Sequence, residues 1–170
     1  AMEYTQKMTP QWQLESSDVQ GTILSSEATS DMGITYLYLN QTCKGIPVRN
    51  AMAVIVVKDG EVFSANQNFV QSAESKINAT AYKIGADAAI INAAQHLGLS
   101  VNSRPIASGR NNDGKYVYEI PELTDTPVTA ALKYELVDKK LILVWNLSMD
   151  MKSNADYWDL NIDAVTGEYV

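Results

Sequence analysis

The first half of the chain alternates between strand-like segments and short turn signals. Residues 33–42 are rich in aromatic and β-branched side chains and end before Lys44-Gly45-Ile46-Pro47, which predicts a strand followed by a turn. Residues 51–57 predict a second strand. The Asp59-Gly60 pair that follows is a strong hairpin signal, because both residues accept the positive φ angles of a tight turn. We therefore expect a β-meander here.

The pattern changes between residues 71 and 86, where Ser, Asn, Ala and Lys replace the strand formers. A helix is predicted after this change, because one helical face collects five apolar residues and Gly98 supplies a stop. The five are Ala86, Ile90, Ala93, Ala94 and Leu97. We place a boundary here, between subdomains 1–75 and 76–170.

Alternation with a period of two returns in the last third of the chain. One sheet face should collect Leu132, Tyr134, Leu136, Leu141, Leu143, Trp145, Leu147 and Met149, with a turn at residues 137–140. A last strand should point Trp158, Leu160 and Ile162 inward and Asp159, Asn161 and Asp163 outward, before a turn at Thr166-Gly167. Residues 11–14 form a weak amphipathic stretch that runs into a turn or cap at Ser16-Ser17-Asp18, and Pro105, Gly109, Asn111, Asn112 and Gly114 mark a loop. The fold class predicted is α+β, a β-meander followed by a helix packed on an antiparallel sheet.

Composition narrows the class of partner. The 170 residues carry a net charge of -7 with only 13 Lys and Arg, scattered along the chain, which argues against nucleic acid. No run reaches the roughly 18 apolar residues of a membrane helix, so no membrane span is expected. Acidic chains of this kind more often bind proteins or cations.

Candidate catalytic and metal-binding residues are few. The zinc-peptidase helix needs two His four residues apart with a Glu between them, and His96 is the only histidine. His96 should favour the helix C-terminus or lie in solvent.

Cys43 is the only cysteine and is expected in the turn. It is either a small hydrophobic residue or a thiolate that caps a partner's zinc. The carboxylates of Asp159 and Asp163 are typical of a charged outer face. We predict no catalytic residue, cofactor or metal ligand.

The motifs in both halves match those of one family. The first half resembles the fungalysin/thermolysin propeptide (FTP) domain. The motif of that domain is a strand ending in Gln, then three residues, then Gly-Ile-Pro-Val and a hairpin closed by Asp-Gly. Here these are Gln41, Gly45, Ile46, Pro47, Val48, Asp59 and Gly60. The C-terminal part is similar to the PepSY-type repeat of fungalysin-like precursors. The residues that carry this similarity are Leu143 to Leu147, Tyr157-Trp158 and Asp163-Ala164-Val165-Thr166-Gly167-Glu168.

This resemblance implies a cystatin-like PepSY half joined to a β-rich half. It also implies an inhibitor and intramolecular chaperone of a zinc metallopeptidase domain encoded downstream, in a secreted, periplasmic or cell-envelope precursor. Because that domain would follow this region, Glu168, Tyr169 and Val170 would lead toward its active-site cleft and pair there as extended backbone. Removing the residues after Asp163 should then abolish inhibition and spare the fold.

Among the aromatic residues, Trp145 and Trp158 should be core, whereas Tyr157 is a candidate for partner contact. The alternative function is a freestanding secreted or envelope module that binds a peptide or protease. A small enzyme finds no support, because no nucleophile is accompanied by a base and no glycine-rich phosphate loop is present.

Overall fold

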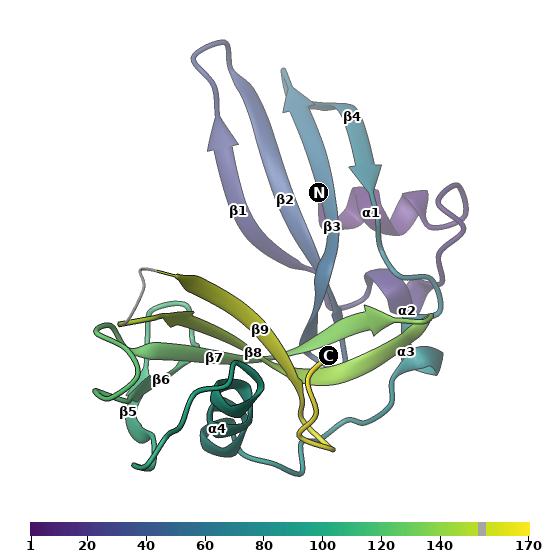
Figure 1. The fold of residues 1–170 in the computed structure, drawn as a ribbon. Helices are drawn as coiled ribbons and strands as arrows, with labels where there is room; N and C mark the ends of the chain where they lie inside the picture. Colours follow the sequence, from purple (N-terminus) through teal and green to yellow (C-terminus); the bar gives the residue numbers. More distant parts are fainter. Residues whose placement is uncertain (153–155) are drawn as a thin grey trace. The chain divides into compact units, whose positions relative to one another are not determined.

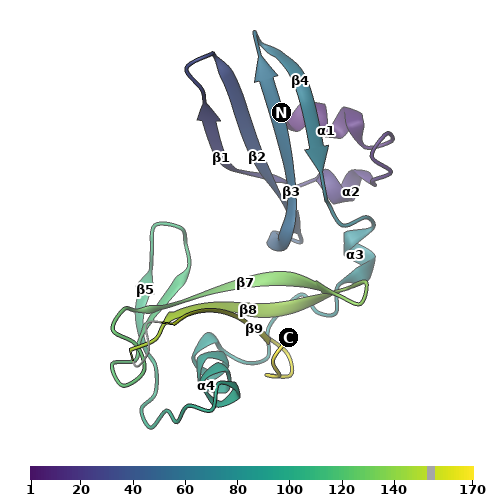
Figure 2. The ribbon, with the colours of Figure 1, turned by 45° about the horizontal axis from the view of Figure 1, so that its top comes forward.

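The computed structural model describes residues 1–152 and 156–170 and confirms the α+β class. The chain divides into two compact units (Figures 1 and 2). The first comprises Ala1–Ile77 with Leu136–Leu141, and the second Asn78–Glu135 with Ile142–Val170. Among the described residues, no helix is long and apolar enough to cross a membrane.

The first unit is built on an antiparallel meander of four strands. These are β1 (Ile23–Thr29), β2 (Ile34–Cys43), β3 (Ile46–Lys58) and β4 (Glu61–Gln67), paired in chain order. The β3–β4 turn has φ angles of 52° at Asp59 and 81° at Gly60, as the Asp-Gly signal predicts. Short helices α1 (Met2–Met8), α2 (Ser16–Val19) and α3 (Ala73–Lys76) complete the unit.

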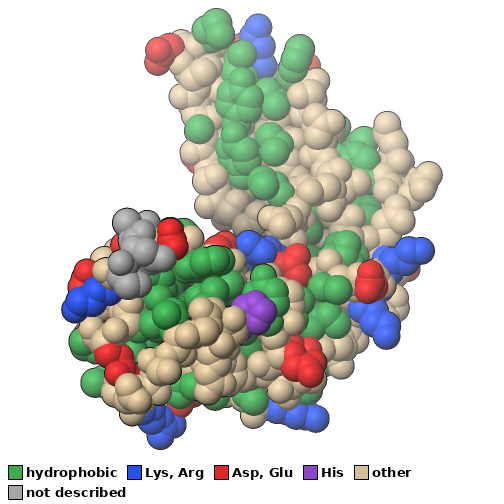
Figure 3. Space-filling view, viewed as in Figure 1, with side chains coloured by type: hydrophobic (Ala, Val, Ile, Leu, Met, Phe, Trp, Pro, Cys, Tyr) green, Lys and Arg blue, Asp and Glu red, His purple; other side chains and the backbone are tan. Residues whose placement is uncertain are grey.

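The two faces of this meander differ. On one face Leu39, Ala53 and Ile55 are fully buried, and the helical segment around Asp18 packs there against Gln41. Alternate residues on the opposite face include the cross-strand pairs Tyr36–Val56 and Tyr38–Val54, which are half-buried. Figure 3 shows hydrophobic side chains gathered over these strands. The helices therefore cover one face of the sheet.

A buried polar network joins three segments of the first unit. The Asp18 carboxylate accepts backbone N–H groups from Glu15 at 2.9 Å and from Ser72 and Ala73 at 2.8 Å each. The Gln41 side chain bonds both the N–H and the carbonyl of Val70, at 2.8 and 2.9 Å, and its amide also donates to the Asp18 carbonyl. Asp18 is 1% exposed and Gln41 0%, so these bonds replace water almost completely.

The second unit packs one long helix on a five-stranded antiparallel sheet. The strands are β5 (Ile106–Arg110), β6 (Tyr116–Glu119), β7 (Val128–Val137), β8 (Lys140–Asp150) and β9 (Tyr157–Asp163), again paired in chain order. Helix α4 (Ala86–His96) buries Ala86, Ala89, Ile90, Ala93 and Ala94, close to the expected face. The sheet supplies Tyr134, Leu143, Trp145, Leu147, Leu160 and Ile162 to the core.

Several local expectations are wrong. Strand β1 and the β5–β6 hairpin were not predicted, and every residue of β1 and β5 is exposed, so neither strand has a buried face to impose alternation. Cys43 does not stand in the turn but ends β2, 3% exposed and paired with Ile46. Leu136 is 45% exposed because it lies beside the β7–β8 turn.

The last strand departs from its predicted pattern at two residues. Trp158 was expected inward but is 38% exposed, because the buried part of β9 begins only at Leu160. Asn161 was expected outward but is 6% exposed. Its amide oxygen accepts from Asn146 at 3.0 Å and its nitrogen donates to Glu135 at 2.9 Å. Cross-strand side chains thus satisfy a polar group that the pattern alone assigns to solvent.

Replacing Asp18 by Asn should destabilise the first unit strongly. The amide keeps the shape but turns an NH2 group toward backbone donors, so a buried N–H loses its acceptor and the free energy of unfolding falls by about 2–4 kcal/mol. Urea unfolding followed by circular dichroism measures this change. Asp138→Asn is the matched control, because Asp138 is exposed in a turn and has a positive φ that Asn tolerates. Equal stability of the two variants would contradict the role given to Asp18.

Candidate functional site

The C-terminal motif residues form a closed turn after β9. Oδ1 of Asp163 accepts the N–H groups of Val165 at 2.7 Å and Thr166 at 3.0 Å. The Asp163 carbonyl accepts the N–H of Gly167 at 2.9 Å. This is a side-chain-capped turn of the kind that Asp favours, so the turn follows from local sequence.

Ala164 anchors this turn in the core of the second unit. It is fully buried, and its N–H donates to the Leu143 carbonyl at 2.8 Å. Its carbonyl accepts the N–H groups of Lys83 at 2.8 Å and Ile84 at 3.1 Å. A deletion after Asp163 would therefore also remove a structural anchor. A deletion confined to residues 168–170 is the variant that separates contact from folding.

Gly167 brings the chain back against helix α4. Its φ is 84°, in the left-handed region that favours glycine, and its carbonyl accepts the Asn92 side-chain amide at 2.9 Å. A Cβ at this position would lie 2.6 Å from the Asn92 amide nitrogen. The glycine is thus required both by the backbone conformation and by the close approach.

The last three residues lie along the outer edge of β9 as a short extended segment. Tyr169 pairs with Ile162 in an antiparallel bridge. Asp163 N–H donates to the Glu168 carbonyl at 2.8 Å, and Val170 N–H donates to the Asn161 carbonyl at 3.0 Å. In this pattern the N–H and C=O of Tyr169 itself point away from β9. The segment therefore presents main-chain donor and acceptor groups on its outer side.

A ring contact holds this segment on α4. Tyr169 stacks on His96, with centroids 3.9 Å apart and an interplanar angle of 11°. The sequence placed His96 at the helix C-terminus but did not predict its partner. Asn92 and His96 are four residues apart and so share a helix face, which is the signal that could have suggested a common partner.

The structure brings three of the four predicted contact residues together. Glu168, Tyr169 and Val170 lie in one segment, where the Tyr169 ring is 50% exposed. Tyr157 is 67% exposed but begins β9, roughly 17 Å along the strand from the residue paired with Tyr169. We define Glu168–Val170 as the tail segment.

The described part of the chain shows no arrangement of side chains suited to bind a metal ion. There, no group of three or more His, Cys, Asp and Glu side chains is arranged to hold a metal ion. Burial first, and then the nearby Glu74 carboxylate, raise the pKa of the Cys43 thiol. A buried protonated thiol is a poor zinc ligand, which favours the interpretation of Cys43 as a small core residue.

Cys43 should accordingly react slowly with a thiol reagent in the folded protein. Burial restricts access, and the raised pKa lowers the thiolate fraction at pH 8. Titration with a chromogenic disulfide should give slow release in buffer and fast release in concentrated urea. Fast, complete reaction without urea would show that the thiol is open to a partner.

Gly167→Ala should cost more stability than Gly114→Ala. Both glycines have a positive φ, 84° and 75°, but no atom lies within 4 Å of a Cβ built at Gly114. Both variants incur backbone strain, while only the first also displaces Asn92 and its hydrogen bond, an added loss of about 1 kcal/mol. Urea unfolding of the two variants measures the difference. Equal losses would mean that the Asn92 contact contributes nothing.

Comparison with known proteins supports the resemblance to the fungalysin/thermolysin propeptide. Residues 21–69 match the family model described as FTP: Fungalysin/Thermolysin Propeptide Motif. The chain is also similar to Extracellular metalloproteinase 10 of Coccidioides posadasii (strain C735), with 28% identity over 134 residues. That match covers 78% of this chain and 21% of the relative, so the chain corresponds to about a fifth of that protein. Together the two matches support the identification of this chain as a fungalysin/thermolysin propeptide region.

Proposed function

We propose that this chain is the propeptide of a secreted fungalysin-like zinc metallopeptidase, which it inhibits and helps to fold. The match of residues 21–69 to the propeptide motif is the observation that carries the proposal. The similarity to an extracellular metalloproteinase over most of the chain supports both the partner and secretion. The chain itself acts by binding and performs no chemistry.

The proposed organisation is an FTP-like subdomain at residues 1–75 and a PepSY-like subdomain at 76–170. The motif match lies within the first of these. The packing of α4 on the antiparallel strands β5–β9 supports a cystatin-like arrangement for the second. In this organisation the first subdomain carries the family signature, and the second carries the tail segment.

Inhibition is assigned to the tail segment. Its inner edge is already paired with β9, and the outward N–H and C=O of Tyr169 are available to an edge strand of a peptidase cleft. Extended backbone bound in this way gains affinity from main-chain hydrogen bonds and excludes substrate sterically. Stacking on His96 reduces the number of conformations that the segment must lose on binding.

The chaperone role follows from the same binding surface. Any ligand that binds only the folded catalytic domain raises its free energy of unfolding, by an amount that grows with the ratio of ligand concentration to Kd. A covalently linked propeptide acts at an effective concentration of order mM. A contact tight enough to inhibit would therefore also favour folding of the linked domain.

Inhibition in trans tests the proposal. The purified chain should inhibit the catalytic domain of its cognate fungalysin-type peptidase saturably, with half-inhibition at about 1 μM or below, as hydrolysis of a fluorogenic peptide reports. Deleting residues 168–170 should raise that concentration at least about tenfold, because the backbone pairing is lost.

Tyr169→Ala and Tyr82→Ala form a matched pair for this assay. The two tyrosines are 50% and 51% exposed, and each contacts one other ring closely, His96 and Trp145 respectively. Only Tyr169→Ala should weaken inhibition. Undiminished inhibition by the chain lacking residues 168–170 would refute the tail mechanism. A complete lack of inhibition by the intact chain would refute the propeptide proposal and favour a freestanding binding module.

A further inference from the structure

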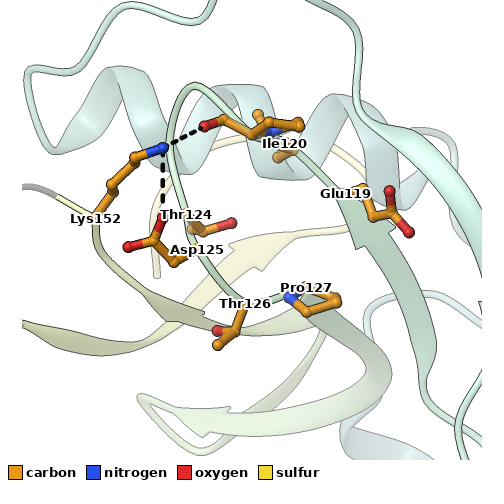
Figure 4. Close-up of a pocket in the computed structure, with 8 residues that line it drawn as sticks. Glu119, Ile120, Thr124, Asp125, Thr126, Pro127 and Lys152 are labelled. Atoms are coloured by element: carbon orange, nitrogen blue, oxygen red, sulfur yellow. Dashed lines mark hydrogen bonds and ion pairs between the residues drawn. The ribbon is translucent and has the colours of Figure 1, made fainter.

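The second unit has two surface features that the proposed inhibition does not use. One is a pocket of about 230 Å³ beside the loop that follows β6 (Figure 4). The Lys152 ammonium lies there 3.4 Å from the Asp125 carboxylate and 3.4 Å from the Pro121 carbonyl, so the chain's own side chain already meets these groups. The other feature is the sequence Asn78-Ala79-Thr80, at the start of the unit.

The chain contains three Asn-x-Ser/Thr sequences, the acceptor pattern for N-linked glycans in secreted proteins. They begin at Asn40, Asn78 and Asn146, and none has proline in the middle position. The pattern is short enough to arise by chance. The folded structure therefore decides which of the three asparagines has room for a glycan.

The fold leaves no room for a glycan at Asn146. Asn146 is 6% exposed, and its amide nitrogen donates to both the Asp159 carboxylate and the Asn161 amide oxygen, the latter at 3.0 Å. A sugar on this nitrogen would replace one of its two N–H donors and leave a buried acceptor without its partner. Asn146 is therefore a structural residue.

Asn40 lies in the middle of the meander. It is half-buried in β2, paired with Ile23 of β1 on one side and with Met52 of β3 on the other. Thr42 completes its sequence, but Thr42 is only 6% exposed and its hydroxyl donates to the Gly21 carbonyl at 2.7 Å. That hydrogen bond explains the threonine without any glycan.

Asn78 differs from the other two in its exposure and in which of its atoms is used. It is exposed and lies outside the helices and strands, in the segment between α3 and α4. Its side-chain oxygen accepts the Leu143 N–H at 2.8 Å, whereas its amide nitrogen has no hydrogen-bond partner among the described residues. Glycosylation modifies the nitrogen and keeps the carbonyl, so a glycan would leave the bond to Leu143 in place.

Packing explains an asparagine at position 78 but not a threonine at position 80. The Asn78 side chain satisfies the N–H of Leu143, which is fully buried. Thr80 is exposed and makes no hydrogen bond within residues 1–152 and 156–170, so the fold gives no reason for a hydroxyl there. Between them, the Ala79 carbonyl accepts the Tyr134 hydroxyl at 2.8 Å, which holds the acceptor sequence on the surface.

We propose that Asn78 carries an N-linked glycan. This assignment rests on the proposed secretion, because the donor, a lipid-linked oligosaccharide diphosphate, is met in the secretory pathway. In the transfer, the Asn78 nitrogen forms a bond to C1 of the first sugar and releases one proton. The bond from C1 to the diphosphate oxygen breaks, and its electron pair leaves with the diphosphate.

Expression of the full chain behind a secretion signal in yeast tests the proposal. Release of the glycans by peptide N-glycosidase in heavy-oxygen water marks each occupied asparagine, and trypsin places the three acceptor sequences in separate peptides. Peptide 77–83 should carry the heavy oxygen in most molecules. Peptides 8–44 and 141–152, which contain Asn40 and Asn146, should not.

Two substitutions at Thr80 form a matched pair. Thr80→Ala should lower the occupied fraction of Asn78 at least about tenfold, whereas Thr80→Ser should keep it, because the acceptor pattern requires a hydroxyl at this position. Neither substitution changes the bond from Asn78 to Leu143, so Tm of the unglycosylated chain made in bacteria should stay the same in both variants. A purely structural role of Thr80 would instead lower Tm in Thr80→Ala and leave the occupied fraction unchanged.

An unmarked peptide 77–83 would overturn the proposal, and it is measured in both the medium and the cell extract so that poor secretion does not hide the result. Equal occupancy of Asn78 in Thr80→Ala would do the same. Marking of peptide 141–152 in the secreted chain would show that burial does not exclude a glycan, which removes the basis for choosing Asn78. Inhibition in trans is measured separately on the unglycosylated chain, so the glycan and the propeptide role can fail independently.

Discussion

The first unit depends on two buried polar side chains, the carboxylate of Asp18 and the carboxamide of Gln41. Neither could be removed from water at low cost without partners, and their partners are backbone groups from residues 15–18 and 70–73. The network therefore requires three distant segments to meet at one point. Gln41 lies where the β2–β3 register shifts, and its side chain reaches Val70.

This constraint has consequences for the rest of the unit. The left-handed conformation of Ser72, with φ of 49°, allows the backbone N–H groups of Ser72 and Ala73 to reach one carboxylate. The helices then lie on the face that contains Leu39 and Ala53, where hydrophobic burial adds its larger but non-directional contribution. Hydrophobic burial would tolerate several placements of the helices, whereas the hydrogen bonds of Asp18 and Gln41 select one.

Features with local causes were predictable from the sequence. The turns at Asp59-Gly60 and Asp138-Lys139 and the helix α4 with its stop at Gly98 all depend on residues within a few positions. The strict alternation expected for β8 is wrong, because Leu143–Leu147 are all buried. The burial of Asp18 and Asn161 depends instead on partners more than ten residues away, which no local pattern records. Strand β1 pairs with β2 but has no buried face, so its own sequence shows no alternation. The tail segment was predicted as extended backbone, but its pairing with β9 and its stacking on His96 required the structure.

The C-terminal turn illustrates the difference between residues that hold the fold together and residues that can form a contact surface. Asp163, Ala164 and Gly167 direct their hydrogen bonds inward, to the turn itself, to β8 and to α4. A partner could engage these groups only by breaking bonds that hold the turn. Recognition by the proposed mechanism therefore falls on groups that the fold leaves unused, the outer backbone of Tyr169 and the exposed side chains around it. Backbone pairing is insensitive to side-chain identity, so discrimination between peptidases would have to reside in those flanking side chains, which lie outside the residues 21–69 that match the family model.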